Sequence, residues 1–231
     1  MNDARSDSSP TSWRRWHYGA AGVMLVAMFG LSFWTWQQLP VDVRIAVHFG
    51  FDGVPDRWAG RAEGLLILPV IATVTAVVMA LVPCIDPRGK NLRADGDWYA
   101  LIVLVVLAVL ACAHVAIIES ALTGRARPAD FITLPLVVLC AALGRFLGRS
   151  RSNFFVGVRT PWTLSSDYAW QRANSLAGSG FLATGIVGSI TLAFAGGPWA
   201  LKVLFGGMVV TAVVATLASY FFWRNDPGAA R

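Results

Sequence analysis

Six apolar runs, each about as long as a bilayer is thick, constrain this chain more than any other feature. They cover residues 18–36, 64–83, 98–121, 131–147, 176–195 and 199–223. In lipid, a lone span satisfies its backbone hydrogen bonds only as a helix, and these runs lack the alternation of a membrane β-barrel. The sequence therefore predicts an all-α integral membrane protein with six transmembrane helices, although the fourth run is short and contains Pro135.

Composition supports a membrane protein. Hydrophobic residues make up 56% of the chain and charged residues 14%, whereas a soluble domain carries about 25% charged residues. The net charge of +6 comes from Lys and Arg in short loops beside the apolar runs, which favours a role in membrane orientation over direct binding of nucleic acid. Cys84, Cys112 and Cys140 have no CxxC spacing and are expected to be packing residues, not disulfide partners or zinc ligands.

The placement of positive charge predicts the orientation. With six spans, thirteen of the nineteen Lys and Arg residues lie on the side of the two termini and six on the other side. The positive-inside rule then places both termini in the cytoplasm. The polar residues 1–17 are expected to be a disordered cytoplasmic segment. The first run is long enough to span and has no cleavage pattern after it, so it is expected to remain as a membrane helix.

The chain divides by order into a two-helix module at 18–83, a central helix pair at 84–144 and a carboxy-terminal helix pair at 145–224. The last two helices carry small residues at every fourth position. These are Gly180, Thr184 and Gly188 in one helix, and Gly207, Thr211, Ala215 and Ser219 in the other. Such stripes let helix backbones approach closely, and we favour packing of the two helices on each other over homodimerisation.

The loop at 39–58 is predicted to be external and partly extended. Apolar residues alternate with others from Val41 to Val47, and Asp52-Gly53 and Pro55-Asp56 are turn signals. A short strand there could be a recognition edge for a peptide or could cover the outer ends of the helices. Its candidate functional residues are His48, Gly53, Pro55, Asp56 and Arg57.

The sequence indicates neither a metal site nor catalysis. His48, Asp52, Asp56, His114 and Glu119 lack a metal-ligand spacing, so no metal is expected. His114 is expected to bond a neighbouring helix, and Glu119 to lie at the membrane interface. No Ser/His/Asp or Cys/His set and no phosphate-binding glycine loop is present. We therefore expect a protein that is not an enzyme and has no cofactor.

The densest chemistry lies in residues 153–167, here named the 153–167 segment, which is predicted to be an interfacial cytoplasmic turn followed by a helix. Residues 153–156 are apolar enough to lie on the bilayer surface, Gly157 permits an unusual backbone angle, and Pro161 makes Thr160 extended. Thr163 or Ser165 is expected to cap a helix that begins near Ser166, with Asp167 at its positive end. Trp162 and Trp170 are expected at headgroup level, with Arg159 and Arg172 facing phosphates or an acidic partner. Alternatively, the arginines only satisfy lipid headgroups.

At these residues the chain resembles the SdpI family of bacterial membrane immunity proteins. The run from Asn153 to Asp167, continued by Trp170 and Asn174, is similar to that family's signature, and the run from Pro40 to Trp58 is similar to a small domain of unknown function that precedes it in longer members. The resemblance covers residues 39–83 and 145–223. The matching signature residues are Asn153, Gly157, Arg159, Thr160, Pro161, Trp162, Thr163, Asp167, Trp170 and Asn174; His48, Gly53, Pro55 and Asp56 match the upstream domain.

The resemblance implies a multi-pass protein of the bacterial cytoplasmic membrane that protects the cell from a secreted peptide toxin. It also implies, for some members, that a transcriptional repressor is held at the membrane. An alternative is a small transporter, or a membrane protein that handles lipid or cell-wall intermediates. The spans lack the paired carboxylates and broken helices expected of secondary transporters. A third possibility is an assembly partner whose loops dock other proteins.

Overall fold

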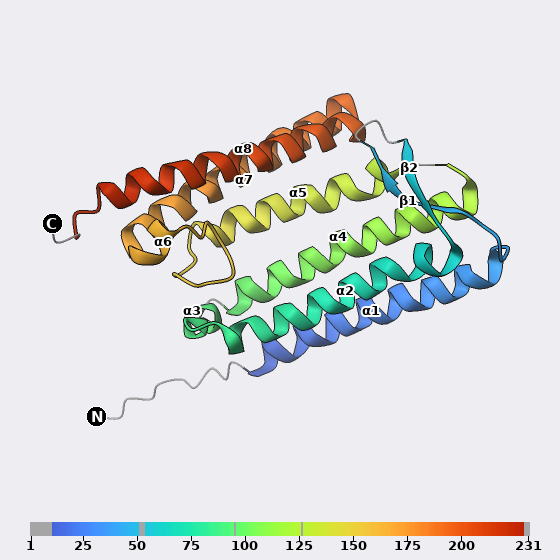
Figure 1. The fold of residues 1–231 in the computed structure, drawn as a ribbon, viewed down its shortest axis with the longest axis horizontal. Coiled ribbons are helices and arrows are strands. Elements are labelled where there is room, and N and C mark those ends of the chain that lie inside the picture. The colour runs from blue at the N-terminus through green and yellow to red at the C-terminus, as the bar shows by residue number, and fades with distance from the viewer. Residues whose placement is uncertain (1–10, 51–53, 95, 126, 229–231) are drawn as a thin grey trace.

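The computed structural model describes residues 11–50, 54–94, 96–125 and 127–228, in which six long helices form a bundle (Figure 1). The helices are α1 (Thr11–Gln38), α2 (Arg61–Ile85), α4 (Gly96–Thr123), α5 (Pro128–Leu147), α7 (Asp167–Ala195) and α8 (Gly197–Arg224). All six are long and apolar enough to cross a membrane, which confirms the predicted fold class. Because α1 begins at Thr11, residues 11–17 of the segment expected to be disordered are helical, and residues 1–10 lie outside the described part.

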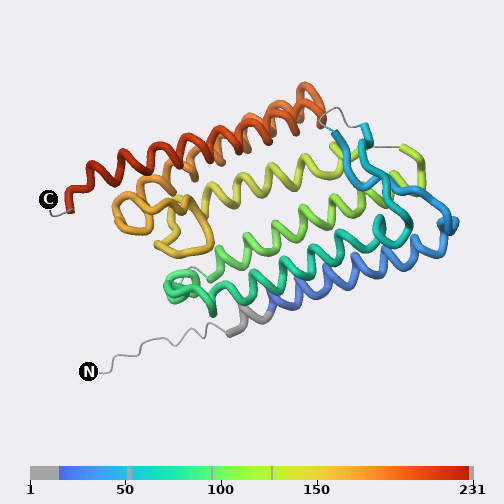
Figure 2. Tube along the Cα trace, in the orientation of Figure 1, coloured from blue at the N-terminus to red at the C-terminus, as the bar shows by residue number. Residues whose placement is uncertain are grey.

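The two ends of the bundle carry different elements (Figures 1 and 2). The start of α1 and the end of α8 lie at one end, here called the terminal end, together with two short helices, α3 (Gly89–Ala94) and α6 (Pro161–Ser165). The opposite end, here called the hairpin end, carries strands β1 (Ile45–Phe49) and β2 (Pro55–Ala59). The 153–167 segment therefore lies on the same side as the termini. That this side is cytoplasmic stays a prediction from the charge distribution.

The bundle is organised as two groups of three helices. Helices α1, α2 and α4 pack on one another, and so do α5, α7 and α8, with the α4–α5 contact joining the groups. Buried side chains from both groups, among them Ile102, Phe146 and Ala177, share one apolar cluster. Large apolar side chains such as Phe194, which is 88% exposed, cover the outside of the bundle. Lipid accounts for their exposure, because a soluble monomer rarely leaves so continuous an apolar surface uncovered.

The small-residue stripes of α7 and α8 face each other within the chain. A methyl group added at Gly180 would lie 2.6 Å from the methyl carbon of Thr211, and one added at Gly207 would lie 2.6 Å from the hydroxyl oxygen of Thr184. Neither position has room for a larger side chain. The structure thus confirms the expected intramolecular packing of these two helices.

Candidate functional site at the terminal end

Asn153 organises the start of the 153–167 segment. Its carboxamide oxygen accepts hydrogen bonds from the backbone N–H groups of Phe155 and Val156, at 3.0 and 2.7 Å. Its amide nitrogen donates to the carbonyl oxygens of Arg151 and Val156, at 3.0 and 3.1 Å. Asn153 is fully buried, so the expectation that it lies on the bilayer surface is wrong. An apolar run suggested that position, but a buried carboxamide is stable here because backbone groups satisfy all its bonds.

Gly157 and Asn174 form the second buried contact. Gly157 has a φ of +122°, which confirms the unusual backbone angle, and a methyl group at this position would collide with the Asn174 carboxamide. The Asn174 carboxamide oxygen accepts the N–H of Val158 at 2.8 Å, and its nitrogen donates to the carbonyl of Trp170 at 3.0 Å. This contact fixes the segment against α7, sixteen residues further along the chain.

Trp170 is buried, which corrects its predicted place at headgroup level. Only 1% of its surface is exposed, and its indole N–H donates to the carbonyl of Ser150 at 2.9 Å. The tryptophan thus ties α7 to the residues that follow α5. An indole at a helix start is equally suited to the headgroup region and to a buried site with one acceptor.

Two successive caps shape the rest of the segment. Thr160, in an extended conformation as predicted, caps α6 in a reciprocal arrangement with Thr163, and Pro161 occupies the first helical turn. The Thr160 hydroxyl also lies 3.0 Å from that of Ser219 on α8. The helix α7 is capped by Ser166, whose hydroxyl oxygen accepts the N–H of Ala169 at 3.0 Å. The expectation that Thr163 or Ser165 caps this helix is therefore wrong, because Thr163 is already used by the short helix before it.

The cap of α7 also connects to the end of the chain. The Ser166 hydroxyl donates to the carboxylate of Asp226, which follows α8. This bond and a second one from the N–H of Gly228 lower the pKa of Asp226. Asp167, in the first turn of α7, is exposed and lies near the positive helix end as expected.

A second loop supports the 153–167 segment through contacts that the sequence analysis did not predict. The Asp86 carboxylate accepts the backbone N–H of Phe154 at 3.0 Å. Arg88 donates to the hydroxyl of Ser152 and to the carbonyl of Leu164, and its guanidinium lies 5.2 Å from the Phe154 ring centre. Asn91 donates to the Ser152 carbonyl at 2.7 Å. No local pattern reveals contacts between residues more than sixty positions apart, so Arg88 could be interpreted only as an orienting charge.

Few of the predicted residues remain accessible. Phe154 and Phe155 are 39% and 37% exposed, and Trp162 is half-buried against Tyr220, with ring centres 5.2 Å apart. Arg159 is exposed, and one of its N–H groups donates to the Phe154 carbonyl at 2.9 Å. We name Phe154, Phe155, Arg159 and Trp162 the exposed face of the segment. Arg172, on α7, lies instead over the rings of Tyr168 and Phe222.

At the hairpin end, β1 and β2 form an antiparallel pair in which Ile45 lies opposite Ala59 and Phe49 opposite Pro55. The predicted extended segment is thus present, but it starts at Ile45 and has a partner strand. Ile45 is fully buried and belongs to a cluster with Leu65 and Ile117, which supports the covering role for this side of the hairpin. Asp52 and Gly53 lie outside the described residues.

The polar side chains of the hairpin are exposed. The imidazole of His48 bonds the Asp56 carboxylate at 2.6 Å, and Arg57 pairs with Glu63. Among the described residues no group of three potential ligands could hold a metal ion. The predicted site residues therefore form two separate sets, one at each end of the bundle.

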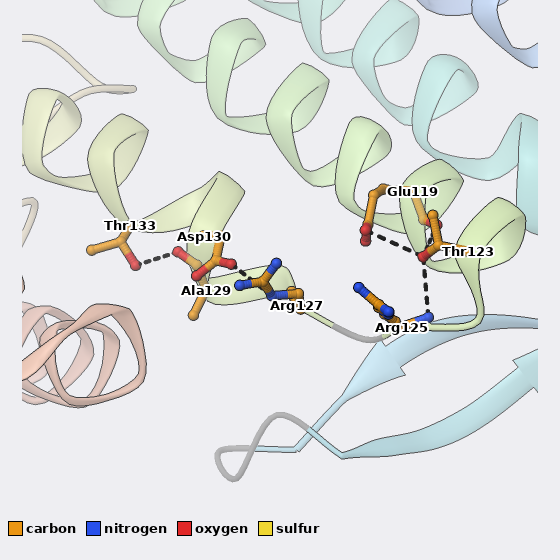
Figure 3. A network of polar contacts seen from close by, with 7 residues as sticks. All are labelled: Glu119, Thr123, Arg125, Arg127, Ala129, Asp130 and Thr133. Carbon is orange, nitrogen blue, oxygen red and sulfur yellow. Dashed lines mark hydrogen bonds and ion pairs between the residues drawn. The ribbon is translucent and has the colours of Figure 1, made fainter.

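His114 and Glu119 also remain separate. The Ser32 hydroxyl donates to the Leu65 carbonyl at 2.7 Å and lies 3.0 Å from Nε2 of His114, which confirms that His114 bonds a neighbouring helix. Glu119 lies near the C-terminal end of α4, where Thr123 donates to its carboxylate at 3.2 Å (Figure 3). Arg127 and Asp130 form a further ion pair, at 3.1 Å, at the start of α5 (Figure 3).

Comparison with known proteins covers both ends of the chain. Residues 149–222 match the model of the SdpI/YfhL protein family, and residues 23–73 match a domain of unknown function, DUF1648. The chain is 20% identical over 178 residues to the Immunity protein SdpI of Bacillus subtilis (strain 168), across 76% of this chain and 86% of that protein. No solved structure matches the chain. With the six apolar helices, these matches identify a multi-pass protein of the bacterial cytoplasmic membrane.

Proposed function

We propose that this chain, whose residues 149–222 match the SdpI/YfhL family model, is a membrane immunity protein that protects its cell from a secreted peptide toxin. The observation that carries the proposal is its similarity to an immunity protein over 76% of the chain. Protection acts by binding and not by catalysis. Within the 153–167 segment, the side chains of Asn153 and Thr163 bond the backbone, and Asp167 is the one carboxylate. A general base with a partner acid, which hydrolysis of a toxin would use, has no counterpart there.

The finer part of the proposal concerns the exposed face of the segment. Its rings and one guanidinium are suited to an acidic or carbonyl-rich surface of a cytoplasmic protein at the membrane boundary. We propose that a regulator docks there and that toxin binding elsewhere on the helices or the hairpin changes its affinity. This part is independent of protection, because a protein can bind a toxin without signalling.

Deletion of the gene in its native host tests protection. The deletion strain, the complemented strain and the wild type are exposed to a panel of secreted membrane-active peptides, including the peptide to which the Bacillus relative gives immunity. At least one peptide should reduce survival of the deletion strain, and the intact chain should restore it. Equal survival of the three strains against every peptide contradicts the immunity function.

Two matched pairs of variants test the exposed face. Arg159→Ala and Trp162→Ala should abolish signalling to the regulator while the protein still inserts, as measured by membrane fractionation. Arg149→Ala, an exposed arginine just before the segment, and Trp199→Ala, 60% exposed at the far end of α8, are the controls. If each variant behaves like its control, the exposed face is not the working surface.

The orientation is tested by labelling. After replacement of Cys84, Cys112 and Cys140, a single cysteine at position 162 should react with a thiol reagent only when the membrane is made permeable. Labelling of intact cells would place the 153–167 segment outside and refute a cytoplasmic partner.

A further inference from the structure

A pocket of about 110 Å³ lies between α1, α2 and α4, near the terminal end but separate from the 153–167 segment. Small side chains, among them Ala76, Ala80 and Ala100, leave this space open where larger ones would close it. Further from the terminal end, the same three helices pack tightly through Met28, Ala72 and Leu107. The pocket is therefore a local widening at the membrane boundary of an otherwise closed helix group.

The lining of the pocket offers a ligand almost no hydrogen-bonding group at depth. Its largest buried residue, Tyr99, is 7% exposed, and its hydroxyl already donates to the Met79 carbonyl at 2.6 Å. The neighbouring wall is formed by apolar side chains such as Val103 and Leu104. A peptide in this space would bury backbone N–H and C=O groups without partners, at a high cost. A hydrocarbon chain carries no such groups.

The lining includes one positively charged side chain. Arg93, on α3, lines the pocket with an exposed side chain, and the Pro83 carbonyl takes one of its N–H donors. His17, on α1, lines the same pocket. Trp16 and Tyr18 beside it are 65% and 58% exposed, as aromatic residues at the level of lipid headgroups are. On the elements that form the pocket, Lys90 and Asp97 are also exposed.

We propose that this pocket binds one acyl chain of an anionic phospholipid, with the lipid phosphate beside Arg93. The apolar walls take the hydrocarbon, and a guanidinium with spare donors is the group best matched to a phosphate. The acyl chain of one lipid molecule can therefore contact the apolar walls while its phosphate contacts Arg93. Such a lipid would bridge α1 to α2 and α4 at the end where their packing widens.

Native mass spectrometry of the delipidated full-length chain tests this proposal. The protein is titrated with phosphatidylglycerol or with phosphatidylcholine that carries the same acyl chains. One molecule of phosphatidylglycerol should bind, about fivefold more tightly than phosphatidylcholine, because a single surface cation contributes about that preference for an anionic lipid. Arg93→Gln should remove the preference, whereas Lys90→Gln on the same short helix should keep most of it.

A second pair of variants tests the acyl-chain part. Ala80→Phe, an exposed position in the lining, should fill the pocket and abolish binding of both lipids. Val77→Phe, 53% exposed on the same helix outside the lining, should leave binding unchanged. Soluble glycerol phosphate in excess should not displace the bound lipid.

Four results would overturn the proposal. They are equal affinity for the two lipids, equal behaviour of Ala80→Phe and Val77→Phe, displacement by glycerol phosphate, and lipid binding that appears only after deletion of residues 2–10. The last result would mean that the chain's own N-terminal residues occupy the pocket.

Discussion

The contact between Gly157 and Asn174 makes a quantitative prediction about two substitutions and their combination. Asn174→Ala leaves the partly buried N–H of Val158 without its acceptor, which costs about 1–3 kcal/mol of unfolding free energy. Gly157→Ala forces a side chain into a backbone conformation with a φ of +122°, which costs about 1–3 kcal/mol. Its methyl group must also displace the Asn174 carboxamide, and this breaks the same hydrogen bond again.

The double variant should therefore lose less unfolding free energy than the two single variants lose in sum. Gly157→Ala alone should cost about 2–6 kcal/mol, but in the Asn174→Ala background only the backbone cost of about 1–3 kcal/mol remains. The coupling should thus be about 1–3 kcal/mol below additivity. Reversible denaturant unfolding of the four proteins in one detergent measures it. Costs that add to within about 0.5 kcal/mol would refute the argument that the two residues share one contact.

Three further predictions follow from other contacts. Ser166→Ala should cost about 1 kcal/mol by loss of the α7 cap. The same substitution should weaken the pH dependence of the unfolding free energy. The lowered pKa of Asp226 stabilises the fold above the usual carboxyl range, and this stability is lost as the pH falls through the pKa of Asp226 in the folded protein. Acid unfolding of the wild type and the variant measures the difference. Ile45→Ala should cost about 2–5 kcal/mol in thermal or denaturant unfolding, whereas Val41→Ala, at an 81% exposed position, should leave stability unchanged. Asp86→Ala should accelerate hydrogen exchange at the Phe154 amide, while exchange in the α7–α8 contact stays as in the wild type.

The helices were predictable because the bilayer removes the alternatives. A run of about twenty apolar residues in lipid has one way to pair its backbone, so the sequence identifies all six spans. The contact of α7 with α8 was predictable for a related reason, since a short turn joins two stripes of small residues. The second strand of the hairpin was not predicted, and it shows the limit of local sequence patterns. The strand β2 has the sequence Pro-Asp-Arg-Trp-Ala, which has little strand propensity, and it is extended because β1 pairs with it.

The errors in the 153–167 segment have a common cause. Each concerned a side chain whose partner lies elsewhere in the chain or one turn away. Three nearby hydroxyl residues, at positions 163, 165 and 166, could cap α7, and the choice of Ser166 depends on the earlier use of Thr163 by α6. The burial of Trp170 depends on an acceptor after α5, at Ser150. A single sequence shows which residues have capping or anchoring chemistry, but not which of them is already engaged.

The hydrogen bonds within the protein also decide which side chains of the segment remain available to a partner. Asn153 uses all four of its hydrogen-bonding positions on the backbone, and Thr163 and Asn174 are fully buried. These residues shape the segment but present nothing outward. Arg159, by contrast, is exposed and has spare N–H donors, and Phe154 and Phe155 in the same segment are exposed too. The exposed face of the segment thus offers one cation with apolar surface, which selects an acceptor or an anion at the membrane boundary. Loss of a buried residue should therefore destabilise the protein and its function together, whereas loss of Arg159 should remove function from a protein of unchanged stability.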